Sequence, residues 1–137
     1  MPLLSLRCMF LLANVLALSC LTGCGPTSLQ LPKTVPVAAK VTLNGKPLEE
    51  AEITFSPVAS GPSSNGKVVD GNVVNLQTNA QKPGVALGQY QVTIYDQPLE
   101  YGGRDLVPDQ YGRLEGGIEV EVTEGGPNEF LFELVEK

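Results

Sequence analysis

The sequence predicts an all-β fold, a seven-strand antiparallel β-sandwich, and three observations support this. Apolar and polar residues alternate in short runs, which is the pattern of strands with one buried face. The chain has 15 Gly and 11 Pro among 137 residues, spread without a period, as expected for short strands joined by many turns. No convincing helical pattern interrupts these runs. Each sheet would have one apolar face, so two sheets packed face to face are the simplest arrangement.

The first two predicted strands flank a tight turn. In the first, which begins at Val37, Val41 and Leu43 alternate with polar residues. Asn44-Gly45 then indicates a turn, because both residues tolerate positive φ. The second strand presents three apolar residues on one side: Ala51, Ile53 and Phe55.

The middle of the chain predicts a short hairpin followed by the clearest strand. Residues 67–69 and 73–78 flank the turn at Asp70-Gly71-Asn72, with Val74 and Leu76 expected to face inward. Residues 89–95 then alternate strictly.

The last two strands are predicted at residues 118–122 and 130–134, with a Gly-rich turn between them. Together with residues 89–95 they are expected to supply much of the core. The residues predicted to face inward are Tyr90, Val92, Ile94, Ile118, Val120, Phe130 and Phe132.

The first 23 residues have the parts of an export signal. Arg7 supplies a positive charge, residues 8–21 are apolar apart from Asn14 and Ser19, and small residues follow. The apolar run is shorter than the roughly 20 residues that a membrane-spanning helix needs. We therefore expect residues 1–23 to be a cleaved signal peptide.

Leu21-Thr22-Gly23-Cys24 at the end of this signal resembles the lipobox of bacterial lipoproteins. The resemblance implies that the Cys24 thiol receives a diacylglyceryl group and that cleavage occurs before Cys24. Two or more acyl chains hold a protein stably on a membrane, whereas one holds it only marginally. An ordinary signal peptide with a free Cys24, or an uncleaved anchor, is the alternative. Cys20 follows a poorer box and is a weaker candidate.

Residues 24–36 are expected to be a lipidated cysteine followed by a Pro-rich tether, and residues 37–137 the β-domain. The usual Asp retention signal for the inner membrane is absent after Cys24, where Gly25 stands instead. This favours an exported protein anchored to the outer membrane.

Composition narrows the function further. Without the signal, the chain has 8 basic and 15 acidic residues, a net charge of −7 (8 − 15), so it is not expected to bind nucleic acid. It has no His, which excludes Ser-His-Asp and Cys-His catalysis. All three cysteines lie at or before Cys24, so no disulfide or thiolate metal site is expected in the domain.

The first strand region, Val41-Thr42-Leu43-Asn44-Gly45-Lys46-Pro47-Leu48, and Leu87-Gly88-Gln89-Tyr90-Gln91-Val92-Thr93-Ile94 are similar to carboxypeptidase regulatory-like domains. The resemblance extends over about residues 37–134. It departs at Ala39, where the family has an early glycine, and at the shortened turn around Asp70. It implies a transthyretin-like, Greek-key sandwich without catalytic residues, acting as a structural or adhesive module and sometimes associated with carbohydrate.

Four patterns suggest chemistry, and each has a simpler explanation. Ser64-Asn65-Gly66-Lys67 fits the S-x-x-K pattern of penicillin-binding enzymes, but that motif requires a helix. The carboxylate pairs at 50/52 and 119/121 could serve a glycosidase, yet alternation explains them as a solvated strand face. Asp70 and Asn72 supply too few oxygen ligands to hold calcium, and a tight turn explains them. Lys40 on the first predicted strand could form an isopeptide bond with an Asn on the last strand, but Asn128 lies before that strand rather than within it.

Residues 96–117 form the longest predicted loop and the expected binding element, because loops of this length are usually functional or disordered. The candidate interaction residues are Tyr101, Arg104 and Tyr111. We expect the tip at residues 101–104 to be exposed and mobile. Alternatively, Tyr111 and its neighbours close the end of the sandwich.

The sequence therefore predicts a non-catalytic binding or scaffolding module at the cell envelope, without cofactor or metal. Its expected partners are the membrane, through the lipid on Cys24, and an envelope protein or a glycan. The alternative function is that of a carbohydrate-binding accessory domain.

Overall fold

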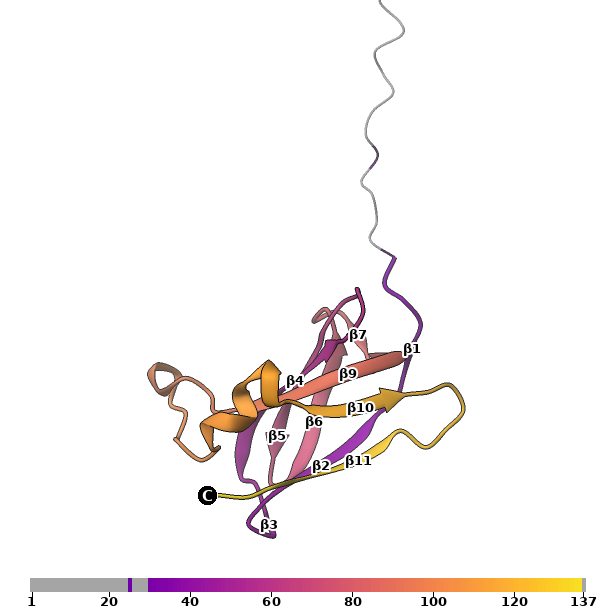
Figure 1. Cartoon of the computed structure of the whole chain (residues 1–137). Coiled ribbons are helices and arrows are strands. Elements are labelled where there is room, and N and C mark those ends of the chain that lie inside the picture. The colour runs from indigo at the N-terminus through magenta and orange to yellow at the C-terminus, as the bar shows by residue number, and fades with distance from the viewer. Residues whose placement is uncertain (1–24, 26–29, 137) are drawn as a thin grey trace, which may run out of the picture. The chain divides into compact units, whose positions relative to one another are not determined.

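The computed structural model describes residue 25 and residues 30–136, and strands joined by short turns dominate that part (Figure 1). One compact unit begins at Leu31. In the described residues the only helical segments are short 3-10 turns, so the all-β prediction is confirmed. The strands are β1 (Thr34–Val35), β2 (Ala38–Leu43), β3 (Lys46–Pro47), β4 (Glu50–Pro57), β5 (Ser64–Val69), β6 (Asn72–Thr78), β7 (Lys82–Pro83), β8 (Val85–Ala86), β9 (Gly88–Tyr95), β10 (Ile118–Val122) and β11 (Glu129–Leu134).

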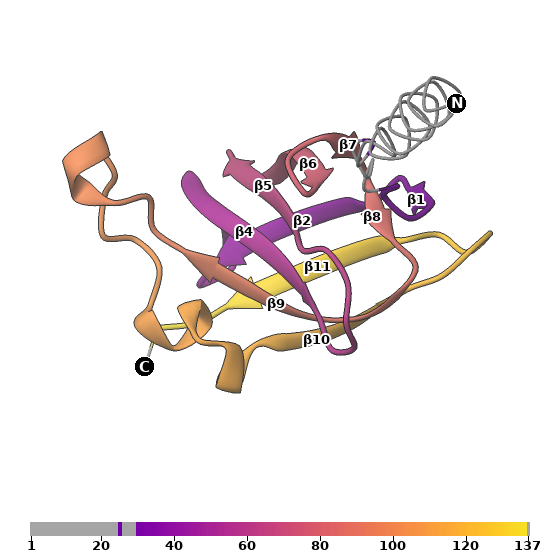
Figure 2. The same cartoon turned by 90° about the horizontal axis from the view of Figure 1, so that it is seen from above.

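Seven of these strands form one curled sheet in the order β10-β9-β4-β5-β6-β2-β11, with β3 beside β2 and β7 beside β6. Figures 1 and 2 show the curl, with β9 and β10 side by side in one part and β2 and β11 in another. The two short strands β1 and β8 pair separately. Each predicted strand is present, although β5 begins at Ser64 rather than at Lys67.

One strand pair departs from the antiparallel prediction. β11 runs parallel to β2, with Glu129 opposite Ala38 and Leu134 opposite Leu43. Alternation shows which face of a strand is buried but carries no information on its neighbour or its direction. The chain leaves β10 at one end of the sheet order and enters β11 at the other, so the last strand lies beside the first and runs the same way.

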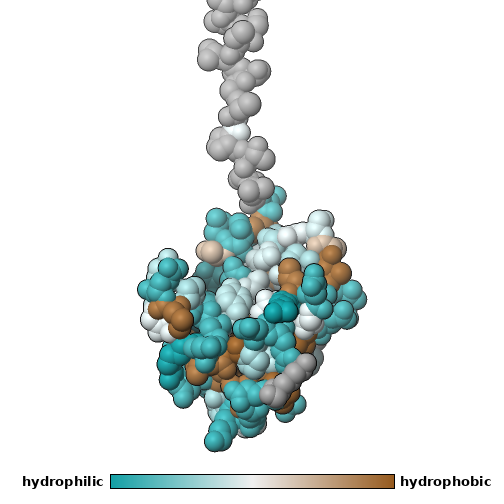
Figure 3. Space-filling view, turned by 60° about the vertical axis from the view of Figure 1, so that its left-hand side comes forward, coloured by the Kyte–Doolittle hydropathy of each residue, from teal (hydrophilic) through white to brown (hydrophobic). Residues whose placement is uncertain are grey.

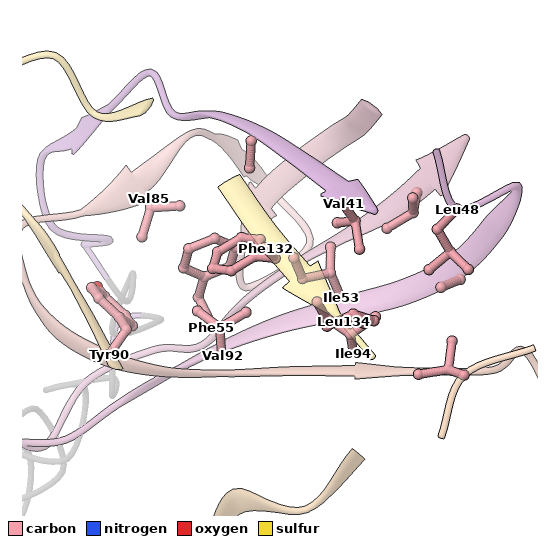
Figure 4. Close-up of a cluster of buried hydrophobic side chains, with 14 of the residues drawn as sticks. Val41, Leu48, Ile53, Phe55, Val85, Tyr90, Val92, Ile94, Phe132 and Leu134 are labelled. Atoms are coloured by element: carbon pink, nitrogen blue, oxygen red, sulfur yellow. The ribbon is translucent and has the colours of Figure 1, made fainter. Parts of the chain in front are cut away.

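The core lies inside the curl (Figure 4). Phe55 of β4 makes an edge contact with Phe132 of β11, with ring centroids 6.3 Å apart, although the two strands are well separated in the sheet order. The Phe55 ring also meets Tyr90 of β9 at 6.2 Å. Aromatic rings prefer such edge-on arrangements. These contacts join distant parts of the sheet around one apolar interior.

The predicted core is confirmed, with one correction in β6. Tyr90, Val92, Ile94 and Phe132 are buried. Three other residues predicted to face inward are partly buried and pack against this core: Ile118, Val120 and Phe130. Val74 is exposed rather than inward, since the positive φ of Asn75 breaks the alternation in β6.

The strand directions sort the connecting segments into two ends of the domain. The N-terminal end consists of residues 30–37, 57–64, 78–88 and 122–129. The loop end consists of residues 44–50, 70–71, 96–117 and 135–136. Every strand of the curled sheet runs between these two ends.

The tether predicted over residues 24–36 is not a free spacer at its far end. Thr34 and Val35 form β1 and pair with Ala86 and Val85 of β8. Period-two alternation cannot identify a two-residue strand, so the sequence pattern missed this pairing.

Candidate functional site

The long segment between β9 and β10 is more ordered than the sequence suggested. It contains three 3-10 turns, η2 (Leu99–Tyr101), η3 (Asp109–Gly112) and η4 (Leu114–Gly116). In Figure 1 it lies on the left, at the loop end of the domain. Asp96 and Val107 divide it into an outer part, which protrudes, and an inner part, which packs on the sheet.

Asp96 closes the base of the outer part. Its Oδ1 accepts hydrogen bonds from the backbone N–H groups of Leu106 at 2.8 Å and Val107 at 3.1 Å, and its Oδ2 is also 3.1 Å from the Val107 nitrogen. The Val107 side chain is buried in the core. A carboxylate that accepts backbone N–H groups makes a strong, charge-assisted clamp. Residues 97–105 therefore form a closed projection from the domain.

The tip of this projection is exposed, as predicted. The Tyr101 side chain is 71% exposed and Leu99 is 72% exposed. Leu99 is not among the predicted interaction residues, because a single leucine beside a proline carries no periodic signal. Hydrophilic surface surrounds separate hydrophobic patches on the side shown in Figure 3.

The two glycines of the tip do not leave its backbone free. The N–H of Gly102 donates to the Leu99 carbonyl at 3.0 Å, and that of Gly103 donates to the Pro98 carbonyl at 3.3 Å. A Cβ at Gly103 would lie 1.8 Å from the Gln97 carbonyl oxygen, so only glycine permits this close approach. The two glycines therefore allow a tight, hydrogen-bonded backbone conformation rather than a free one.

Arg104 is engaged within the domain rather than free. Its Nη2 forms an ion pair with Glu49, and its Nε lies 3.2 Å from Glu50 Oε1. These hydrogen bonds, first that of Glu49 and then that of Glu50, raise the pKa of the guanidinium. The three side chains are all substantially exposed, so a partner with its own carboxylate can compete for Arg104.

Tyr111 has a structural role. Its hydroxyl oxygen lies 2.9 Å from the backbone nitrogen of Val135 and 3.3 Å from the Val135 carbonyl. Its ring is half-buried against the core. Tyr111 therefore closes the loop end, which was the alternative given for it above, and it is separate from the exposed tip.

An open hollow of about 510 Å³ lies beside the projection and is lined by residues 105–110 and Glu136. Its carboxylates come from Asp105, Asp109 and Glu136. Within residues 30–136 and at residue 25, no group of three or more acidic, His or Cys side chains is arranged to hold a metal ion.

The other chemical patterns have simple structural explanations. Ser64 is buried and shares a hydrogen bond of 2.9 Å with Thr78, whereas Lys67 is exposed on the opposite face of β5, so the two do not form an S-x-x-K site. Asn72 Nδ2 donates to the Asp70 carbonyl in a tight turn. The amide of Asn128 bonds both the N–H and the carbonyl of Thr123.

The four lipobox residues, Leu21, Thr22, Gly23 and Cys24, lie outside the described residues, so lipidation remains a prediction. In the part of the chain that is described, no helix is long and apolar enough to cross a bilayer. Comparisons of the chain with family models, with curated proteins and with solved structures found no match.

Proposed function

We propose that this protein is an exported lipoprotein, held on a membrane by acyl chains on Cys24, whose β-domain is a non-catalytic binding or scaffolding module at the cell envelope. The observation that carries the anchor is Leu21-Thr22-Gly23-Cys24 directly after a short apolar run. The residue after Cys24 is Gly25 rather than Asp, which favours the outer membrane.

The anchor is tested by replacing the acylated cysteine. Cys24→Ala should abolish palmitate labelling and leave unprocessed precursor, because neither the acyl transfer nor the cleavage has its cysteine. Cys20→Ala, four residues upstream, is the matched control and should be labelled normally. Normal labelling of Cys24→Ala would overturn the lipoprotein proposal.

The proposed architecture is a transthyretin-like sandwich made by the two parts of the curled sheet. β6 and β2 share a single register pair, Asn72 with Lys40, so the sheet is joined only narrowly at that point. The Phe55–Phe132 contact across the interior supports two layers facing one another. A compact domain whose connecting segments lie at two ends can present one of these segments to a partner.

The proposed recognition element is the projection of residues 97–105. Leu99 and Tyr101 are its exposed apolar and aromatic groups, and Arg104 adds a planar cation at its base. Tyr and Arg are enriched among residues that dominate interface energies. We therefore assign first contact with an envelope protein to this tip.

The recognition element is tested by recovery of envelope proteins after crosslinking in cells. The double variant Leu99→Ala, Tyr101→Ala should lower recovery of a specific partner about tenfold or more, the effect of losing 1.4 kcal/mol or more of binding free energy. Leu131→Ala removes a similarly exposed leucine from β11 and is the control. Equal recovery from both variants would place recognition elsewhere.

One observation favours the second candidate, a carbohydrate-binding accessory domain. Tyr101 is 71% exposed, and Tyr95, the last residue of β9, is 40% exposed. Exposed aromatic rings are the surfaces on which sugars stack. A glycan array probed with the wild-type chain and with Tyr101→Ala separates the two functions, because only the carbohydrate function predicts a signal that depends on Tyr101.

A further inference from the structure

The segment that leads from Cys24 to the β-domain is fastened to one end of it. β1 pairs with β8, and Thr34 Oγ1 donates a hydrogen bond to the Pro83 carbonyl at 2.7 Å. Lys82 Nζ donates to the Pro32 carbonyl at 2.8 Å. An ion pair between Lys33 and Glu124 adds a third connection. Residues 32–35 are therefore part of the N-terminal end of the domain, and we call this set of contacts the fastening.

Gly84 makes this fastening possible. Its φ is +90°, and a Cβ at this position would lie 2.5 Å from the carbonyl oxygen of Val35. The close approach of the two backbones therefore requires glycine. Any other residue at position 84 would have to push β1 away.

The fastening shortens the reach of the lipid anchor. From Cys24 to Leu31 there are seven residue steps, which span at most about 25 Å when fully extended. A free tether reaching to Val37 would have spanned about 45 Å. Strand β9 then carries the chain about 24 Å from Gly88 at the N-terminal end to Tyr95 at the loop end. An anchor on Cys24 thus holds the N-terminal end within about 25 Å of the bilayer.

The hollow beside the fastening is lined by uncharged and mostly apolar residues. Pro32 lines an open hollow of about 360 Å³. The rest of the lining comes from two chain segments, Pro57 with residues 59–62, and residues 86–90. Leu87, in this lining, is 41% exposed, and Val58, which adjoins Pro57 in the chain, is 62% exposed. No charged residue occurs in residues 53–66 or 83–95.

The two ends of the domain also differ in formal net charge. The N-terminal end carries Lys33 and Lys82 against Glu124 and Glu129, a formal net charge of zero. The loop end carries nine acidic and three basic residues, a formal net charge of −6 (3 − 9). A membrane surface with anionic lipids repels the loop end but not the N-terminal end.

We propose that the N-terminal end rests on the lipid bilayer, with Pro32, Val58 and Leu87 at the headgroup level, and that the loop end faces away from it. This inference rests on the proposed anchor at Cys24. It names the partner of one surface, a lipid bilayer, and it places the projection of residues 97–105 on the side open to a partner.

The test uses the full chain, acylated in cells and reconstituted in vesicles of phosphatidylethanolamine and phosphatidylglycerol. All native cysteines lie at or before Cys24, so a cysteine introduced into the domain is the only free thiol of the acylated, processed protein. Leu87→Cys reports on the N-terminal end, and Leu114→Cys, at a site of similar exposure, reports on the loop end. Each is labelled with an environment-sensitive fluorophore, and brominated lipids serve as the quencher.

Quenching at position 87 should exceed quenching at position 114 several-fold, with a blue-shifted emission at position 87 only. Equal quenching at the two positions would overturn the orientation. The measured mass of the protein shows whether Cys24 carries acyl chains, and this separates the two ways in which the test can fail. Absence of acyl chains on Cys24 overturns the anchor and the orientation together, whereas acylated protein with equal quenching overturns the orientation alone.

A backbone variant tests the fastening itself. Gly84→Ala should displace β1 and bring the quenching at position 87 close to that at position 114. Gly125→Ala is the matched control, because Gly125 has a φ of +76° but open space around a Cβ, and it should keep the difference. Thr34→Val removes only the hydrogen bond to Pro83 and should reduce the difference without unfolding the domain. An unchanged difference in both Gly84→Ala and Thr34→Val would overturn the role of the fastening.

Discussion

The phenolic oxygen of Tyr111 is bonded to both backbone polar atoms of Val135: it accepts from the nitrogen at 2.9 Å and donates to the carbonyl at 3.3 Å. The pair joins the inner part of the long loop to the segment that follows β11. A second contact holds the same segment: the backbone N–H of Glu136 donates a hydrogen bond to Asn44 Oδ1 at 3.1 Å. Residues 135–136 are thus held at the loop end from two sides.

Tyr111→Phe should lower the free energy of unfolding by about 0.5–1.5 kcal/mol, the usual net value of an intramolecular hydrogen bond. Chemical denaturation measures it. Tyr101→Phe, at a 71% exposed site, is the control and should change stability by less than about 0.5 kcal/mol. Equal effects of the two variants would mean that the Val135 contacts contribute nothing.

Ile94→Ala should lower the free energy of unfolding by about 2–5 kcal/mol, because Ile94 is fully buried in the centre of the core and its truncation leaves a cavity. Thermal or urea denaturation measures the change. Leu131→Ala, at a side chain that is 58% exposed on β11, should change it by about 0.5 kcal/mol or less. A small effect at Ile94 would contradict the register of β9.

Asp96→Ala should release the outer part of the long loop. The backbone N–H groups of Leu106 and Val107 lose their acceptor, at a cost of about 1–3 kcal/mol if they stay out of water. Amide hydrogen exchange at residues 97–107 should accelerate, while exchange in β4 and β9 should change much less. Uniform acceleration throughout the domain would show that Asp96 supports the whole fold rather than the loop.

Tyr101→Ala combined with Arg104→Ala should leave thermal stability nearly unchanged. Tyr101 is exposed, and the ion pairs of Arg104 with Glu49 and Glu50 join exposed side chains, which contribute little to stability because water and salt screen them. A loss of several kcal/mol would make the projection a structural lid. It would then be excluded as the recognition element.

Stability should fall as the pH rises above about 10, because burial raises the pKa of Tyr90 above its ordinary value of 10.0. Between the two pKa values the unfolded chain has lost the phenolic proton and the folded chain retains it. The folded state therefore binds more protons there, and the free energy of unfolding decreases with pH. Tyr90→Phe should flatten this decrease, and an identical pH profile in that variant would contradict the assignment.

The sequence by itself determined which residues form strands and, for most of them, which side is buried. Period-two alternation is a local property, so the strand containing Tyr90, Val92 and Ile94 could be recognised without knowing its neighbours. The turn at Asn44-Gly45 was equally readable, and both residues do adopt positive φ. The resemblance of Leu21-Thr22-Gly23-Cys24 to a lipobox is likewise a local pattern, and the proposed anchor depends on it alone.

Only the tertiary structure decided the strand order, the parallel direction of β11 and the contacts of the candidate residues. Arg104 meets Glu49 across 55 residues of sequence, Tyr111 meets Val135 across 24, and Thr34 meets Pro83 across 49. No local pattern encodes such pairs, because they arise when the whole sheet curls to bury its apolar face. The same curl left Leu99 and Tyr101 in solvent and fastened the tether at the opposite end.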